Sequence, residues 1–170
     1  MRMETLNEED IRAIFLKIKD IMVEKKDLLI GLDGAIGDGD LGLAMSIGFT
    51  KVAEALQDFK EKDVGKIFMQ AGVILAKNAP STIGTLIATG FMKGGKVVQG
   101  REEIGLTEIF KMMDAFVKEI MIRGKAKPGE KTVLDSLCPA VQAFKLAQEK
   151  NKTLKEGLVM AYNAALQGVE

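Results

Sequence analysis

Histidine is absent from this 170-residue chain, and cysteine occurs once, at Cys138. Without histidine there is no imidazole general base, no Ser–His or Cys–His nucleophile pair, and no imidazole ligand for zinc. A single cysteine excludes an internal disulfide, which is typical of a protein in a reducing compartment. Any metal ion would have to be held by oxygen ligands, which favours magnesium, calcium or manganese.

An excess of charge and long apolar runs are also missing. Lys and Arg together number 24, as do Asp and Glu, so no net field attracts nucleic acid or an anionic membrane. No apolar run approaches the roughly 20 residues that a membrane-spanning helix needs. Residues 1–10 are acidic and do not resemble a secretory signal. We therefore expect a cytoplasmic protein with one domain, residues 1–170, that binds neither nucleic acid nor membrane.

Apolar residues recur at spacings of three and four through almost the whole chain, which is the period of a helix. Period-2 alternation of β-branched residues is scarce, so we expect no strand. Asn7 is the expected N-cap of the first helix and Gly124 the expected C-cap of a later one, while Pro139 predicts a kink or a break. The predicted fold is all-α, with about eight helical segments over residues 11–22, 28–32, 44–56, 64–77, 82–98, 106–123, 132–150 and 153–168.

One glycine-rich loop, residues 32–42, concentrates acidic side chains. Asp33, Asp38 and Asp40 lie within eight residues of one another, and such carboxylates repel unless a cation lies among them. Gly39 can adopt positive φ, which permits a tight turn that aims its two aspartate neighbours inward. Magnesium commonly takes one or two carboxylates plus substrate phosphates. The loop predicts a magnesium site, and the alternative is an ordinary solvated turn.

Three other motif patterns fit less well. The glycines of residues 37–42 have dinucleotide-binding spacing, but that fingerprint needs a βαβ unit, and the residues that follow keep a helical period. A calcium EF-hand starting at Asp38 would require glycine and glutamate where the chain has Leu43 and Phe49. Residues 90–96 match the front of a P-loop, but no strand precedes them, and Val97 replaces the required Ser or Thr.

Two long motifs carry a resemblance to a known family. Residues 32–40, with Leu32-Asp33 followed by Ile36-Gly37-Asp38-Gly39-Asp40, are similar to the magnesium motif of the nucleotide-binding L subunit of dihydroxyacetone kinase. Residues 124–135 (Gly-Lys-Ala-Lys-Pro-Gly-Glu-Lys-Thr-Val-Leu-Asp) resemble the second signature of that family. Gly48-Phe49 and Gly84-Thr85 also fall where the family has them, so the similarity covers almost the whole chain.

The resemblance implies an antiparallel helical barrel or bundle of about eight helices, with a nucleotide site at one end. By similarity, Asp33, Asp38 and Asp40 would hold a pair of magnesium ions that bridge to the phosphates of ADP or ATP. No side chain would act as a catalytic group, because the metal ions would mediate transfer. The implied nucleotide contacts are Leu41, Gly42, Leu43 and Ala44 at a helix N-terminus, Ser81 and Thr82 in a phosphate loop, and Gly124 and Val133 along the adenosine.

In this family the phosphoryl group passes to dihydroxyacetone on a separate K subunit, and the donor is a phosphotransferase-system protein or ATP. The chain departs from the family at three places: Leu41 replaces a histidine, residues 78–82 lack the paired glycines of the phosphate loop, and relatives continue past Glu170 through a loop and a closing helix. Three functions stay open: a phosphotransferase subunit that needs a K-type partner, a non-catalytic nucleotide- or phospholigand-binding regulatory module, and a helical scaffold whose acidic loop is vestigial. Homo-oligomerisation stays open as well.

Overall fold

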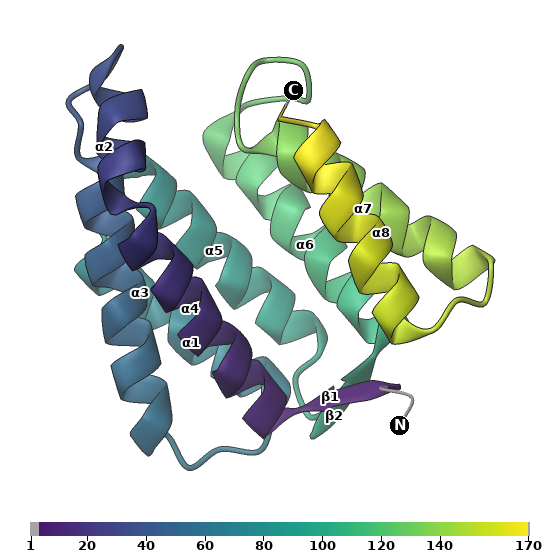
Figure 1. Ribbon diagram of the computed structural model, residues 1–170. Helices are drawn as coiled ribbons and strands as arrows, with labels where there is room; N and C mark the ends of the chain where they lie inside the picture. Colours follow the sequence, from purple (N-terminus) through teal and green to yellow (C-terminus); the bar gives the residue numbers. More distant parts are fainter. Residues whose placement is uncertain (1–3, 170) are drawn as a thin grey trace.

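The structure, a computed structural model, describes residues 4–169 and is built almost entirely from helices (Figure 1). Eight helices fall within the described residues, so the all-α prediction is confirmed. The elements are β1 (Thr5–Asn7), α1 (Glu8–Glu24), α2 (Lys26–Gly34), α3 (Leu41–Asp58), α4 (Val64–Asn78), α5 (Thr82–Val97), β2 (Glu103–Gly105), α6 (Leu106–Gly124), α7 (Leu134–Glu149) and α8 (Leu154–Gln167). None of the described helices is long and apolar enough to cross a membrane.

One short pair of strands was not predicted, and the expectation of no strand is therefore wrong. β1 and β2 pair in antiparallel register, with Leu6 opposite Ile104. Both of these side chains are buried, so the pair closes the base of the core where α1 and α6 begin. Each strand has three residues, which is too short to show a period-2 pattern in the sequence.

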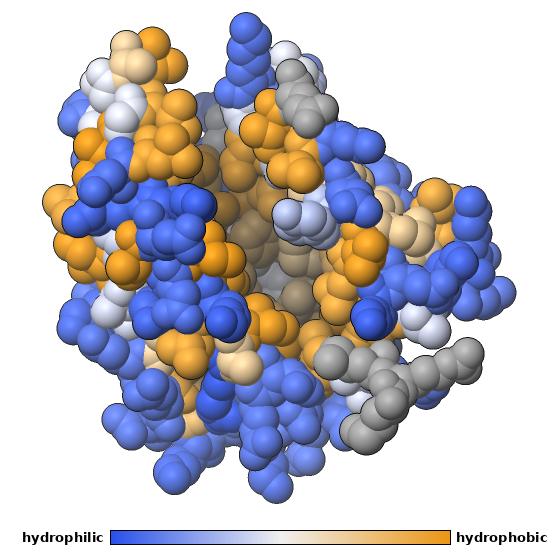
Figure 2. All heavy atoms as spheres, in the orientation of Figure 1, coloured by the Kyte–Doolittle hydropathy of each residue, from blue (hydrophilic) through white to orange (hydrophobic). Residues whose placement is uncertain are grey.

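The helices form an open bundle rather than a closed barrel. Helices α3 to α7 each pack against the next helix in the chain, and α1 packs mainly against α3. Between α1 and α8 lies an apolar cleft of about 350 Å³, which is visible as a hollow between the two halves of the molecule in Figure 2. Its walls include Ile14 and Ile18 of α1, Met113 of α6 and Leu158 of α8.

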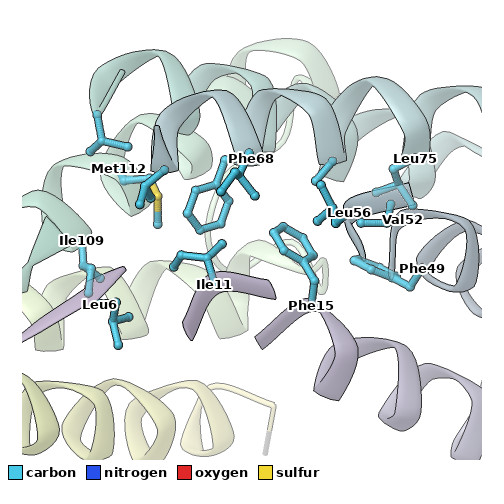
Figure 3. Packing of buried hydrophobic residues seen from close by; sticks show 14 of the residues in the cluster. Leu6, Ile11, Phe15, Phe49, Val52, Leu56, Phe68, Leu75, Ile109 and Met112 are labelled. Carbon is cyan, nitrogen blue, oxygen red and sulfur yellow. The ribbon is translucent and has the colours of Figure 1, made fainter. Parts of the chain in front are cut away.

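Phe15 anchors α1 to the rest of the bundle. Its side chain is 1 % exposed, and its ring centroid lies 5.5 Å from that of Phe68 on α4 and 5.3 Å from that of Phe91 on α5. Figure 3 shows Phe15 and Ile11 pointing from α1 into the same cluster as Phe68. Burial of a phenylalanine side chain stabilises a fold by about 1.5–3 kcal/mol. This packing fixes α1 and, through it, the start of α2.

Two helix ends follow the sequence closely. Asn7 caps α1, since its side chain accepts hydrogen bonds from the amides of Glu9 and Asp10, and the Asp10 carboxylate accepts from the Asn7 amide in return. Thr153 and Glu156 form the same reciprocal box at the start of α8. Hydrogen bonds from the amide and hydroxyl of Thr153 lower the pKa of the Glu156 carboxyl to about 2.

Other helix ends differ from the prediction. Gly124 is the last residue of α6, and the left-handed residue that ends the helix is Lys125, with φ of 52°. The sequence predicted a kink or a break at Pro139; α7 runs unbroken through this residue, so the break does not occur. Helix α7 also begins at Leu134 rather than at Thr132, whose hydroxyl accepts a hydrogen bond of 3.2 Å from the Leu134 amide.

Candidate metal and anion site

Three carboxylates meet between the end of α2 and the start of α3. Asp33 lies in the last turn of α2, Asp38 in the connecting loop, and Asp40 immediately before the first residue of α3. Each side chain offers one oxygen, and these oxygens all lie within 4.8 Å of one another. Asp33 is half-buried, and the other two are exposed. The structure thus places on one side of a turn the three residues that the sequence singled out.

Local hydrogen bonds hold this turn in shape. The Gly37 amide donates to the Asp33 carbonyl oxygen at 2.6 Å, and Gly39 takes a φ of 75°, which glycine adopts without strain. The Asp33 side chain accepts from the Leu41 amide at 3.2 Å, so one carboxylate oxygen ties the end of α2 to the first turn of α3. The Asp38 carboxylate accepts from the Asp40 amide at 3.4 Å, so backbone amides contact two of the three acidic side chains.

The electrostatics of the cluster favour a cation. Partial desolvation of its exposed side chain, together with the charges of Asp38 and Asp33, raises the pKa of the Asp40 carboxyl. Among residues 4–169, none of the ion pairs involves any of these three aspartates. The described part of the protein leaves their mutual repulsion without a compensating ion pair, and a bound cation would relieve it.

Gly42 allows α2 and α3 to approach closely enough to form the cluster. A Cβ atom at this position would lie 2.1 Å from the Lys26 carbonyl oxygen and 2.8 Å from Cγ1 of Ile30, both on α2. Only glycine fits such a contact without a shift of one helix. The family resemblance implied a nucleotide contact for Gly42; the structure gives it a packing role that no residue spacing reveals.

The other residues predicted at the start of α3 have different surroundings. Leu41 lines a cavity beside the three aspartates, whereas the Leu43 side chain is 51 % exposed. Ala44 is buried, and its amide donates to the Asp40 carbonyl oxygen at 2.9 Å inside the helix. The Leu41 amide is likewise engaged by Asp33. These two amides already have acceptors within the protein.

The N-terminus of α5 faces the acidic cluster. A cavity of about 350 Å³ has the three aspartates and Leu41 on one side and Ser81, Thr82 and Ile83 on the other. Ser81 is the N-cap of α5, because its hydroxyl accepts from the Gly84 amide at 3.1 Å. The first amides of a helix carry partial positive charge and attract anions. An acidic wall and an anion-attracting wall therefore face each other across this cavity.

A second, larger cavity adjoins the first. It measures about 630 Å³ and shares Asp40, Ser81 and Thr82 with the acidic cavity. The remaining residues of its wall are Pro80, Thr85, Leu86, Arg123 and Gly124. The residues that line the two cavities come mainly from the end of the bundle where α2 and α6 end and α5 begins, which is the upper end in Figure 1.

The two predicted adenosine contacts, Gly124 and Val133, differ in their surroundings. Gly124 lies in the cavity wall, whereas Val133 packs half-buried against the apolar cluster of α6 and α7. Arg123 also lines the cavity, although the sequence analysis did not predict it as a site residue. From the sequence it is only a basic residue in the last turn of a helix. Its position beside Gly124, at the start of the second motif, was the available signal.

The second motif folds as a loop around one carboxylate. Asp135, in the first turn of α7, accepts hydrogen bonds from the amides of Gly129 and Thr132. These donors lower the pKa of the Asp135 carboxyl. Lys131, with φ of 57°, and Gly129, with φ of 92°, supply the left-handed turns that the loop needs. Asp135 therefore holds the loop before α7, whereas the N-cap residue of this helix is Val133, which makes no side-chain cap hydrogen bond.

Comparisons with known proteins identify relatives of the whole arrangement. The family described as the DAK2 domain matches residues 35–170. The ADP-binding subunit DhaL of the PEP-dependent dihydroxyacetone kinase of Escherichia coli (strain K12) is 34 % identical over 146 residues, which are 86 % of this chain and 70 % of that subunit. The ADP-binding subunit of PEP-dependent dihydroxyacetone kinase 2 of Listeria innocua is 35 % identical over 126 residues, and the chain spans 58 % of its length.

A solved structure has the same fold. The dihydroxyacetone kinase of C. freundii, crystallised in complex with AMP-PNP and Mg²⁺, superposes with a TM-score of 0.73 over 92 % of this chain, at 24 % sequence identity. The match covers 27 % of that much longer protein. At this level of identity the likeness establishes the shared helical architecture.

Proposed function

Because the chain belongs to the DAK2 domain family, we propose that it is a magnesium-dependent phosphotransferase subunit that binds ADP or ATP. In this proposal the acceptor is dihydroxyacetone or a similar small hydroxy-ketone held by a K-type partner subunit. The observation that carries the proposal is the meeting of the three aspartates with the N-terminus of α5 across one cavity. The cytoplasm, where nucleotide and magnesium are both abundant, is the compartment that we propose.

The acidic cluster fits magnesium by its chemistry. Asp33, Asp38 and Asp40 offer hard carboxylate oxygens, close together and without competing ion pairs. Magnesium binds such sites through one or two carboxylates plus the phosphates of a ligand. When bound, magnesium would neutralise phosphate charge and polarise the transferred group. A pair of ions, as the family resemblance implies, would distribute the three carboxylates between them.

The chain itself would bind and orient the nucleotide. The two cavities, of about 630 and 350 Å³, each fall in the range of about 300–1,000 Å³ that small-molecule sites occupy. The N-terminus of α5, with the side chains of Ser81 and Thr82, would receive the phosphates, while the wall at Leu86 and Gly124 would receive the nucleoside. Phosphoryl transfer requires mainly positioning and charge neutralisation, and neither needs a histidine.

The proposed donor is a phosphotransferase-system protein. The two relatives from Escherichia coli and Listeria innocua are named as PEP-dependent enzymes, which supports this donor over ATP. The K-type subunit and the donor would both have to reach the phosphate end of the nucleotide. The open upper end of the bundle, where the acidic loop is exposed, is the face that we propose for both partners.

A second function, a non-catalytic nucleotide- or phospholigand-binding regulatory module, is favoured by one observation. Leu41 lines the acidic cavity at the position where the family that the chain resembles has a histidine. An apolar side chain thus stands where that family has a polar contact to the ligand. Such a module would bind nucleotide without passing on a phosphoryl group. A transfer assay therefore separates the two functions, and a binding assay does not.

Calorimetric titration of ADP, with and without magnesium, tests the site. We expect binding that requires magnesium and that is lost in Asp33→Ala, Asp38→Ala and Asp40→Ala, with helicity unchanged by circular dichroism. Asp27→Ala is the matched control, because Asp27 lies on the same helix with its side chain 92 % exposed. Retained magnesium-dependent binding in all three site variants would refute the proposed site.

A coupled assay tests the reaction. The chain would be combined with a K-type subunit, dihydroxyacetone and either a phosphotransferase-system donor or ATP, and formation of the phosphorylated product would be followed. Product formation that depends on this chain and on Asp38 supports the phosphotransferase. Tight nucleotide binding without product, under conditions where an Escherichia coli-type subunit is active, supports the regulatory module.

A further inference from the structure

Arg123 is a charged residue at the site to which the proposed function assigns no role. It lies in the last turn of α6 and lines the larger cavity, together with Asp40, Ser81 and Thr85. Among the described residues that line the two cavities, it is the one with a positive charge. Its guanidinium group takes part in none of the hydrogen bonds or ion pairs found within residues 4–169.

The other described arginines are engaged with the protein itself. Arg12 donates to the carbonyl oxygens of Leu56, Phe59 and Glu61 and thereby closes the end of α3. Arg101 forms an ion pair of 3.7 Å with Glu108. Both have a structural partner, whereas Arg123 extends from a helix end onto a cavity. A basic residue in the last turn of a helix does complement the helix dipole, but that effect needs no cavity.

Arginine suits phosphate for physical reasons. Its planar guanidinium presents several N–H donors in a fixed fork, is always charged, and loses less hydration than an ammonium group on binding. The larger cavity shares the lining residues Asp40, Ser81 and Thr82 with the acidic cavity. Consider a nucleotide with its metal-bound end at the aspartates and its phosphate chain along the N-terminus of α5. Its phosphates would then lie next to the part of the cavity wall that contains Arg123.

We propose that Arg123 is a nucleotide-binding residue that contacts the phosphate chain from the side opposite the acidic cluster. This inference rests on the proposed function, because it takes the ligand to be a nucleotide with its metal at the aspartates. The phosphate chain would then be held on one side through the acidic cluster and on the other by the guanidinium group and the first amides of α5. Leu86 and Gly124 form the neighbouring apolar wall.

A general positive field is the competing explanation. The loop after α6 carries Lys125, Lys127 and Lys131, which are exposed, and none of them lines either cavity. If the segment acted only through its summed charge, loss of any one of these charges would weaken binding about as much as loss of Arg123. A direct contact makes Arg123 unlike the lysines. Lys127→Gln is therefore the matched control for Arg123→Gln.

The experiment is calorimetric titration of ADP in the presence of magnesium for the wild-type chain and its variants. Arg123→Gln is expected to weaken binding by about 10-fold or more, the usual effect of losing a charged hydrogen bond. Arg123→Lys should recover part of the affinity, because it keeps the charge and loses the fork. Lys127→Gln should remain within about twofold of wild type, since exposed charges at a distance are screened by salt. Circular dichroism shows whether each variant is folded.

Salt dependence supplies a readout that a purely structural role would not change. Raised potassium chloride should weaken ADP binding more steeply in wild type than in Arg123→Gln, because the variant has lost a charged contact. Wild-type affinity in Arg123→Gln would overturn the inference and leave the proposed function standing. Equal losses in Lys127→Gln, or equal salt dependence in wild type and Arg123→Gln, would also overturn it. A wild-type chain that bound no nucleotide would overturn both.

Discussion

Gly42→Ala tests the link between helix packing and the acidic site. The new Cβ atom would lie 2.1 Å from the Lys26 carbonyl oxygen and 2.9 Å from the Ile30 amide nitrogen, two atoms of the α2 backbone. Because real Cβ contacts are not this short, α2 and α3 would have to separate by about 1 Å. α2 carries no buried side chain and packs mainly on α3, so it is the helix that would move.

The expected change in stability is the difference between two opposing effects. Overpacking costs about 1–3 kcal/mol, whereas alanine in place of glycine favours the helix by about 1 kcal/mol. The obstacle is backbone, which cannot rotate away, so we expect a net loss of about 1–2 kcal/mol in the free energy of unfolding. Movement of α2 also displaces Asp33 relative to Asp40. A misplacement of about 1 Å can cost a site up to about 100-fold.

Urea unfolding and calorimetric titration of ADP with magnesium measure the two effects separately. Binding should weaken by about 10-fold or more, which is a larger effect than the loss of stability alone would produce in a folded protein. Gly31→Ala is the control, because a Cβ at Gly31 in α2 would meet nothing within 4 Å. It should stabilise the protein by up to about 1 kcal/mol. Wild-type stability and wild-type affinity in Gly42→Ala would refute the reasoning.

Two further predictions concern the scaffold. Phe15→Ala removes a side chain that is 1 % exposed and should lower the free energy of unfolding in urea by about 3–5 kcal/mol; a loss no larger than that of Leu16→Ala, 43 % exposed, would contradict the assigned core. The pKa of the Glu156 carboxyl is about 2, below its ordinary value of 4.5, so its stabilising effect is complete above pH 4.5 and is lost as the pH falls toward 2. Glu156→Gln should therefore be less stable than wild type at neutral pH and equally stable in strong acid; a constant difference across this range of pH would contradict the cap.

Local signals in the sequence were enough to predict most helices and several of their ends. Asn7 and Thr153 cap helices through contacts within three residues, so their roles follow from the adjacent sequence. The strand pair joins Leu6 to Ile104 through contacts between distant parts of the chain, and three-residue strands leave no periodic pattern. The break considered at Pro139 is absent from α7. A proline in the sequence does not reveal whether tertiary packing holds the helix together around it.

In the candidate site, too, some features could be predicted from the sequence and others could not. The aspartates could be singled out because mutual repulsion within one short loop needs no knowledge of the fold. The packing role of Gly42 could not be predicted, since it depends on the path of α2 past α3. Arg123 was missed for the same reason, because the meeting of the end of α6 with the start of α5 is a tertiary event. The resemblance to a family supplied Ser81 and Thr82, which no local pattern distinguished from a helix cap.

Binding of manganese, followed by electron paramagnetic resonance, tests the central claim most directly. Manganese prefers the same oxygen ligands as magnesium, and its free ion gives a strong signal that disappears on binding. ADP binds part of the manganese by itself, so the reference is the signal with ADP alone; the wild-type chain should lower the signal of free manganese below that level, and Asp38→Ala should leave it there. An undiminished signal with the wild-type chain and ADP, or equal uptake of manganese by Asp38→Ala, would contradict the account.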